Sequence, residues 1–124
     1  MSIGNYLELE LLDQVFRNAA APAIATTYIS LHTGDPGETG ANELTGGSYA
    51  RQAGAFSVAA AGATSNTGDI DFTGMPSATL THVGVWDATA AGNFLWGGAL
   101  TASKATNSGD TFRIATGDLD VTLD

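Results

Sequence analysis

The chain has 124 residues, 44% of them hydrophobic, which is enough for one domain that folds without a metal ion or a disulfide. It contains no cysteine, so disulfide scaffolds, cysteine-ligated zinc and thiol catalysis are excluded. Thirteen acidic residues against four Lys and Arg give a formal net charge of −9, and a chain with so few cations is not expected to bind nucleic acid or a membrane.

Charged residues make up only 14% of the chain, well below the roughly 25% of an average soluble domain. The surface must therefore be built largely from Thr, Ser, Asn, Gly and Ala. Such a surface suits a protein that packs against other subunits, although a stable secreted monomer would have the same composition. No signal peptide is predicted, because Glu8, Glu10 and Asp13 interrupt the apolar residues near the N-terminus. We therefore expect synthesis in the cytoplasm.

The first segment, 2–18, has the pattern of a helix. Ser2 is the predicted N-cap, and Asn18, followed by Pro22, predicts the end of the helix. The apolar residues recur at every fourth position and form one stripe. These residues are Ile3, Leu7, Leu11 and Val15.

Leu9 is also apolar and lies off the main stripe of this helix. A helix that is apolar on more than one side is suited to contact both its own domain and a neighbouring subunit. We therefore predict that the helix carries interaction residues. These are Leu7, Leu9, Leu11 and Phe16.

After residue 22 the apolar residues alternate with polar ones, as in strands with one buried face. Turn sequences rich in Gly, Asn and Asp separate the runs, and no second helix is available to connect parallel strands. The sequence therefore predicts a single mainly β domain over 1–124: an antiparallel β-sandwich or jelly-roll-like fold over 23–124 with one N-terminal α-helix. The predicted strands are 27–32, 50–59, 69–73, 79–87, 93–100, 110–114 and 119–123.

Two predicted strands in the middle of the chain carry large side chains. Val83 and Val85 share one face of their strand and Trp86 lies on the other, which predicts a central strand with both faces buried. In the next strand, expected to form a hairpin with the first, Phe94 and Trp96 share a face. Two alternatives stay open: Trp86 and Trp96 pair across the hairpin, or they are two independent core tryptophans.

A long loop, 33–48, separates the first two predicted strands, and it opens with a turn built on Asp35 and Pro36. Loops of this length are usually functional or ordered by a partner. The chain leaves the loop at Tyr49 and reaches Arg51, one of only four cations.

Arg51 is predicted to form a bidentate ion pair with Asp35, Glu38 or Glu43, which would pin the loop or bridge to an adjacent subunit. The alternative is an Arg51 that lies in solvent without a partner. The three loop carboxylates could instead hold Ca²⁺ together with backbone carbonyls, but we favour a protein without a cofactor.

The two histidines, His32 and His82, are not accompanied by a second histidine or a carboxylate at the spacing of a metal or catalytic site. We interpret both as ordinary hydrogen-bonded side chains. No nucleotide-binding loop and no nucleophile elbow occurs in the sequence.

Four carboxylates form pairs two residues apart on predicted strands: Asp69 with Asp71, and Asp118 with Asp120. Each pair is expected to point to one face, where it could bind a cation or act as acid and base. The same spacing is typical of the solvent face of an amphipathic strand, and we favour that interpretation. No catalytic residue and no metal ligand is predicted.

Several blocks of the sequence resemble a widespread group of small tailed-bacteriophage virion structural proteins, often labelled tail fibre proteins. These blocks are Leu-His-Thr-Gly-Asp-Pro-Gly at 31–37, Tyr-Ala-Arg at 49–51 and His-Val-Gly-Val-Trp-Asp at 82–87. The resemblance extends over most of the chain. It implies a component of the virion, assembled in the host cytoplasm.

Three hypotheses follow for the function. The first is a non-enzymatic capsid decoration protein that self-associates, with a trimer as the expected order, and docks on virion proteins such as the major capsid or tail proteins. The second is a tail fibre or baseplate component whose loop, or Trp86 and Trp96, contacts host glycans. The third is a glycan hydrolase that uses the aspartate pairs. The predicted interaction residues are Leu7, Leu9, Leu11, Phe16, Asp35, Pro36, Glu38, Glu43, Tyr49 and Arg51.

Overall fold

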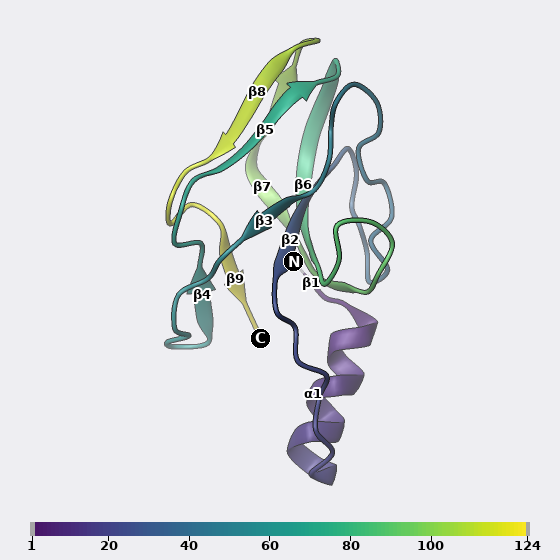
Figure 1. The fold of residues 1–124 in the computed structure, drawn as a ribbon, viewed down its shortest axis with the longest axis vertical. Helices are drawn as coiled ribbons and strands as arrows, with labels where there is room; N and C mark the ends of the chain where they lie inside the picture. The colour runs from purple at the N-terminus through teal and green to yellow at the C-terminus, as the bar shows by residue number, and fades with distance from the viewer. Residues whose placement is uncertain (1, 124) are drawn as a thin grey trace.

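In the computed structural model, which describes residues 2–123, a β-rich body carries one helix that projects from its lower end (Figure 1). The predicted fold class is confirmed: the chain is mainly β, with antiparallel sheets and one N-terminal helix. The elements are β1 (Ser2–Ile3), α1 (Asn5–Arg17), β2 (Thr27–His32), β3 (Gln52–Gly54), β4 (Ala63–Ser65), β5 (Ile70–Met75), β6 (Ala78–Trp86), β7 (Phe94–Thr106), β8 (Asp110–Ile114) and β9 (Asp120–Thr122).

Five strands form the main sheet in the order β1-β7-β6-β2-β3, and all of its pairs are antiparallel. Two further pairs, β5 with β8 and β4 with β9, form small sheets of two strands each. The predicted hairpin of β6 and β7 is present, and β6 is the central strand of the main sheet. Residues Val83 to Trp86 of β6 are all buried, so both faces of this part of the strand are covered, as the sequence predicted.

The main core lies on one face of the five-stranded sheet. Ile29 and Leu31 from β2 are fully buried there with Val83 of β6, and Phe72 of β5 joins the same cluster. Alternation along each strand produces this arrangement, because every second side chain points to the same face. The small sheet of β5 and β8 completes this core (Figure 1).

The helix begins later than the sequence predicts. Its N-cap is Gly4, and Ser2 and Ile3 form β1 against Gly97 and Trp96 of β7. Pairing with β7 holds these two residues in an extended conformation, which a periodicity argument could not foresee. The predicted end is correct, because Asn18 adopts a left-handed conformation with φ 52°.

Several strand boundaries differ from the prediction. The expected strand 50–59 is reduced to β3, and the short β4 was missed. β7 is longer than expected, since its end pairs with the start of β6 beyond an irregular stretch, Ala78 opposite Thr106. Local alternation predicts such strands, but their ends depend on the partner strand.

A register shift in the hairpin decides between the two arrangements of the tryptophans. Trp86 lies opposite Phe94, and Val85 lies opposite Trp96. The extra residue, Leu95, is a bulge that turns Phe94 away from the face of Trp96, so the expectation that these two share a face is wrong. The tryptophans are independent: Trp96 belongs to the main core, and Trp86 contacts Phe94 edge-on at 5.2 Å between ring centroids.

Candidate functional site

Loop 33–48 folds over the second face of the main sheet and converts it into a buried layer. Leu44 donates its backbone N–H to the carbonyl of Leu31 (2.8 Å), and Thr33 donates to Asn42 within the loop (3.1 Å). Pro36 is fully buried. The predicted long loop is thus ordered by its own domain rather than left free.

Glycines permit the close approach of the loop to the sheet. Gly40 has φ +83°, and a Cβ at this position would overlap the ring of Trp86. In the sheet itself, on the face that the loop covers, a Cβ on Gly84 would lie 2.6 Å from the Ser30 hydroxyl and 2.8 Å from Nε2 of His32. Neither position has room for a side chain.

A buried polar network lies between the loop and this face of the sheet. His32 Nδ1 lies 2.8 Å from the carbonyl of Ala41 in the loop, and its Nε2 lies 2.6 Å from the Ser30 hydroxyl. Trp86 Nε1 donates to the same hydroxyl oxygen (2.9 Å). A carbonyl can only accept, so Nδ1 carries the proton and Nε2 accepts from Ser30. Burial lowers the pKa of His32 below its ordinary value and favours this neutral form.

Arg51 connects the loop to the turn between β6 and β7. Its Nε and Nη2 donate to the two carboxylate oxygens of Glu43 at 2.9 and 2.8 Å. Nη1 donates to the carbonyls of Ala88 (3.0 Å) and Ala91 (2.9 Å). The guanidinium carbon lies 3.7 Å from the ring centroid of Trp86, a cation–π contact. With only 7% of its side chain exposed, Arg51 acts as a clamp inside one chain.

Tyr49 completes the clamp. Its hydroxyl donates to Glu43 (2.8 Å) and accepts from the backbone N–H of Leu31 (3.0 Å). Burial raises the pKa of Tyr49, so the phenol stays neutral and can donate. Burial alone would raise the pKa of Glu43, but the hydrogen bonds from Arg51 and Tyr49 outweigh it and the pKa lies below its usual value. Glu43 is therefore held as a carboxylate.

The structure brings together only part of the predicted loop set. Of the three carboxylates considered for Arg51, Glu43 is the partner. Asp35 instead accepts the backbone N–H of Gly37 (2.8 Å), and the side chain of Glu38 is exposed. Within residues 2–123, no group of three or more His, Asp or Glu gathers where it could hold a metal ion. Calcium binding by the loop stays an untested alternative, for which Glu43 would have to leave Arg51.

The aspartate pairs lie at the surface, and Arg113 contacts both members of the first pair. Asp71 accepts from Arg113 Nε at 2.7 Å, and Asp69 lies 3.5 Å from the same guanidinium, which confirms that both point to one face. The hydrogen bond from Arg113 lowers the pKa of Asp71. Asp120 accepts a hydrogen bond from the Ser65 hydroxyl.

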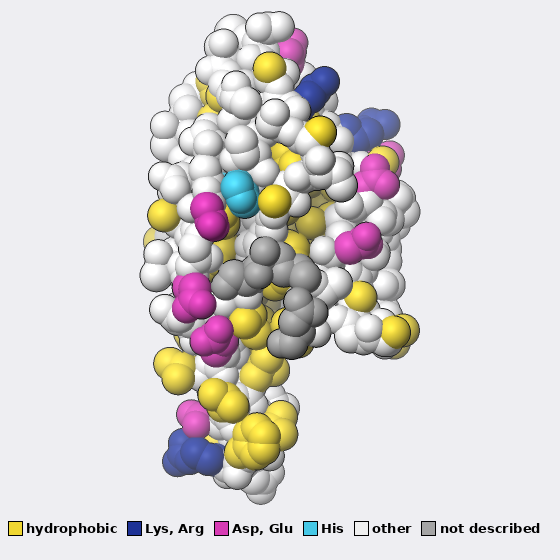
Figure 2. All heavy atoms as spheres, turned by 180° about the vertical axis from the view of Figure 1, so that it is seen from behind, with side chains coloured by type: hydrophobic (Ala, Val, Ile, Leu, Met, Phe, Trp, Pro, Cys, Tyr) yellow, Lys and Arg dark blue, Asp and Glu magenta, His cyan; other side chains and the backbone are white. Residues whose placement is uncertain are grey.

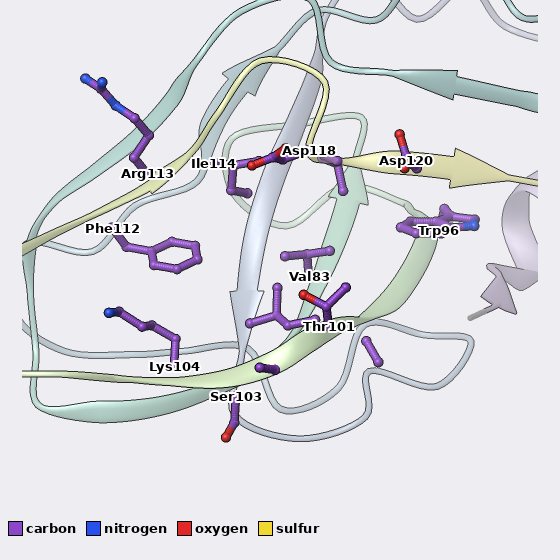
Figure 3. A pocket seen from close by; sticks show the side chains of 14 residues that line it. Val83, Trp96, Thr101, Ser103, Lys104, Phe112, Arg113, Ile114, Asp118 and Asp120 are labelled. Atoms are coloured by element: carbon purple, nitrogen blue, oxygen red, sulfur yellow. The ribbon is translucent and has the colours of Figure 1, made fainter.

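A pocket of about 580 Å³ lies between β7 and β8 (Figure 3). The side chain of Phe112 points into it, while that of Arg113 points away. Asp118 and Asp120 both line it, so this is where the predicted second carboxylate pair lies. Its floor is apolar, with Val83, Trp96, Ile114 and Leu119.

The predicted helix residues fall into two groups. Leu7 and Leu11 are half-buried, and Leu7 packs against the main core. Leu9 and Phe16 are 64% and 79% exposed. α1, described along its whole length, has no fully buried residue, because it extends beyond the sheet that its first turns contact.

Two more apolar residues of α1 are exposed, Leu12 (53%) and Val15 (68%). The sequence analysis placed Val15 in the same apolar stripe as Leu7 and Leu11. Val15 is nevertheless exposed, because the helix continues past the end of the β-body and nothing among the described residues covers its last turns. Figure 2 shows hydrophobic side chains gathered over the lower end of the molecule, where the helix lies. The spacing of Leu9, Leu12 and Phe16 was the signal in the sequence that could have identified this second face.

The buried polar groups of the described residues bond to one another or to the backbone. Among the described residues, every buried side-chain nitrogen or oxygen has a hydrogen-bond partner. No helix in the described part of the chain is long and apolar enough to cross a membrane.

The model of a protein family, the podophage GP4 fiber I protein gp80, matches residues 2–122, so the chain belongs to this family. It is therefore a phage virion structural protein, associated with other virion components. No curated protein matches the chain significantly.

Proposed function

We propose that this protein is a non-enzymatic subunit of the tail fibre apparatus, held in the particle by contacts with other virion proteins. The observation that carries the proposal is the projecting helix α1, whose Leu9, Val15 and Phe16 are more than half exposed. A contiguous apolar face of this kind is typical of a surface that another protein covers. Membership of a fibre family supports a fibre over a capsid decoration.

The buried chemistry of the loop supports a structural role. Arg51, Glu43 and Tyr49 bond to one another and to backbone groups, so they rigidify the β-body and are not directed at a substrate. Contact with host glycans through the tryptophans finds no support, because Trp86 and Trp96 are 8% and 4% exposed and cannot offer a ring face. The exposed part of loop 33–48 is the remaining surface for such a contact.

The enzyme hypothesis can be tested directly. Asp118 and Asp120 line the pocket between β7 and β8, so D118N/D120N is the informative variant and D69N/D71N is its matched control. We expect wild-type protein to degrade no glycan in a panel of host surface polysaccharides, and D118N/D120N particles to infect normally. Turnover that D118N/D120N abolishes and D69N/D71N retains would contradict the proposal.

Self-association, with a trimer as the expected order, is part of the proposal and rests on the lightly charged surface. Sedimentation of the purified protein measures it. A mass equal to the 12.6 kDa monomer at high concentration would contradict self-association in solution.

The copy number separates the fibre from the capsid. Quantitative mass spectrometry of purified virions, with the major capsid protein as internal reference, should give the low copy number of a fibre component. A copy number comparable to that of the major capsid protein would contradict the fibre and favour decoration of the head.

A further inference from the structure

The exposed face of α1 has the geometry of a helix that docks in a groove. Leu9, Leu12 and Phe16 stand at positions i, i+3 and i+7, which places them on one side of the helix. Val15 lies beside them, and all four are more than half exposed. Anchors with this spacing are those by which an amphipathic helix inserts into an apolar groove.

Carboxylates border this face. Glu8 stands one turn before Leu12, and Asp13 one turn after Leu9, so they flank the apolar residues from opposite sides. Asp13 also contacts Arg17 at 3.2 Å, in an exposed i,i+4 pair. The apolar side chains are therefore bordered by the carboxylate of Glu8 on one side and by Asp13, paired with Arg17, on the other.

The rest of the chain adds to this negative field. The formal net charge is −9, and two of the four cations are paired within the β-body, Arg51 with Glu43 and Arg113 with Asp71. Around α1, a surface of this sign attracts a partner with basic side chains more strongly than a second copy of the same acidic helix.

Packing of two copies of α1 would bring like charges together. With Leu9, Leu12 and Phe16 as the seam, a parallel pair sets Glu8 of one copy against Asp13 of the other. An antiparallel pair sets the two Asp13 residues close to each other. Each arrangement carries a repulsion that a partner with basic side chains would replace by attraction.

We propose that α1 docks through Leu9, Leu12 and Phe16 into an apolar groove of a different virion protein. This inference rests on the proposed function. Lysine or arginine side chains of that groove meet Glu8 and Asp13. Self-association of the chain uses the β-body and leaves α1 for this partner.

The partner is identified by crosslinking inside assembled particles. A phage that lacks its own copy of the gene is grown on a host that supplies the protein with a photo-crosslinking side chain in place of Leu12. The control carries the same group in place of Val58, which is 93% exposed on the β-body. We expect the group at position 12 to crosslink to a second virion protein. The linked peptide should contain a Lys or Arg close to the linked residue, within one turn if the peptide is helical or within two residues if it is a strand. Crosslinks to this chain, or to a peptide without a cation, overturn the inference.

Incorporation into virions tests the face itself. L9Q/F16Q should lower the number of copies per virion by about tenfold or more, because two large apolar side chains lose their burial. E8Q/D13N should lower it by a smaller factor, and this loss should grow when particles are washed at low ionic strength, where charge attraction is strongest. V58Q and D118N are the matched controls and should leave the copy number unchanged, since both positions are exposed on the β-body, outside α1.

The outcomes separate this inference from the proposed function. Normal copy numbers for L9Q/F16Q overturn the docking by α1 while the fibre assignment stands. Wild-type protein that is absent from purified virions overturns the proposed function itself. The thermal unfolding of L9Q/F16Q should match that of the wild type, because both side chains already lie in water in the single chain.

Discussion

At the scale of single residues, Arg51 is the side chain on which the second face of the sheet depends. Its guanidinium bonds to Glu43 and to two carbonyls of the turn between β6 and β7, and it stacks on Trp86. Lysine offers a point charge and cannot reproduce this planar set of donors. The role of Arg51 is therefore specific to arginine and not only to positive charge.

Replacement of Arg51 by lysine should lower the free energy of unfolding by about 2 kcal/mol, the scale of lost hydrogen bonds to charged groups. Urea denaturation of the purified protein measures this. The matched variant is R113K, whose salt bridge to Asp71 is exposed to solvent, so its loss of stability should be much smaller. Equal losses in the two variants would contradict the clamp.

Gly84 is required because a methyl group there has no free space. The added Cβ of G84A would press on Ser30, His32 and Phe94, and overpacking of this kind costs about 1–3 kcal/mol. G68A is the control, because no atom lies within 4 Å of its added Cβ, and it should change stability by less than about 1 kcal/mol. Urea denaturation distinguishes the two, and a neutral G84A would show that the loop face is loosely packed.

His32 makes the stability depend on pH. Burial lowers its pKa in the folded state below the unfolded value of about 6.5, so the unfolded state binds the proton more readily. The stabilisation is present above about pH 6.5 and is lost as the pH falls below that value, by up to about 1.4 kcal/mol per pH unit. Between pH 7 and pH 5 the wild type should therefore lose more stability than H32N. Parallel curves for the two proteins would refute this assignment.

At the scale of elements, loop 33–48 behaves as part of the sheet that it covers. Its amides at Thr33 and Leu44 donate to backbone carbonyls, and the clamp closes over them. Removal of the clamp should open the loop before the rest of the domain unfolds, because local openings follow the weakest set of contacts.

Hydrogen exchange can detect this opening. In R51K the amides of Thr33 and Leu44 should be at least about tenfold less protected than that of Val85 in the central strand β6, because they exchange when the loop alone opens. Equal protection at all three amides would show that the loop opens only when the whole domain unfolds.

The sequence predicted the elements of this fold better than their contacts. Alternation identified β2 and the hairpin of β6 and β7 because one face of each is buried in the main core. It could not foresee the bulge at Leu95, which follows from how the strands pair and which separates Phe94 from Trp96. The helix was predicted by its period, but the exposed part of it, with Val15, depends on where the β-body ends.

The same limit applies to the clamp. The sequence offered three carboxylates for Arg51, and the choice of Glu43 follows from the path of the loop. That path is fixed by contacts distant in sequence: Gly40 lies against Trp86 and Phe94, and Pro36 lies against Gly97. Contacts between residues so far apart in the chain produce no periodic pattern in the local sequence, so the sequence could not predict them.

At the scale of the whole molecule, a rigid β-body carries a helix whose apolar side lies in water. The body needs no partner for its polar groups, since those that are buried among the described residues are satisfied internally. The helix is different, because Leu9, Val15 and Phe16 have no cover within the chain. The β-body thus satisfies its own polar groups and buries its own core, whereas the apolar face of α1 needs another virion protein to cover it.

The most direct test of this account is the density of the intact particle by cryo-electron microscopy, at a resolution that shows helices. We predict the β-body in the fibre, with the Leu9, Leu12 and Phe16 face of α1 buried against a different protein. Density for the β-body on the capsid surface, or α1 with this face in solvent, would contradict it.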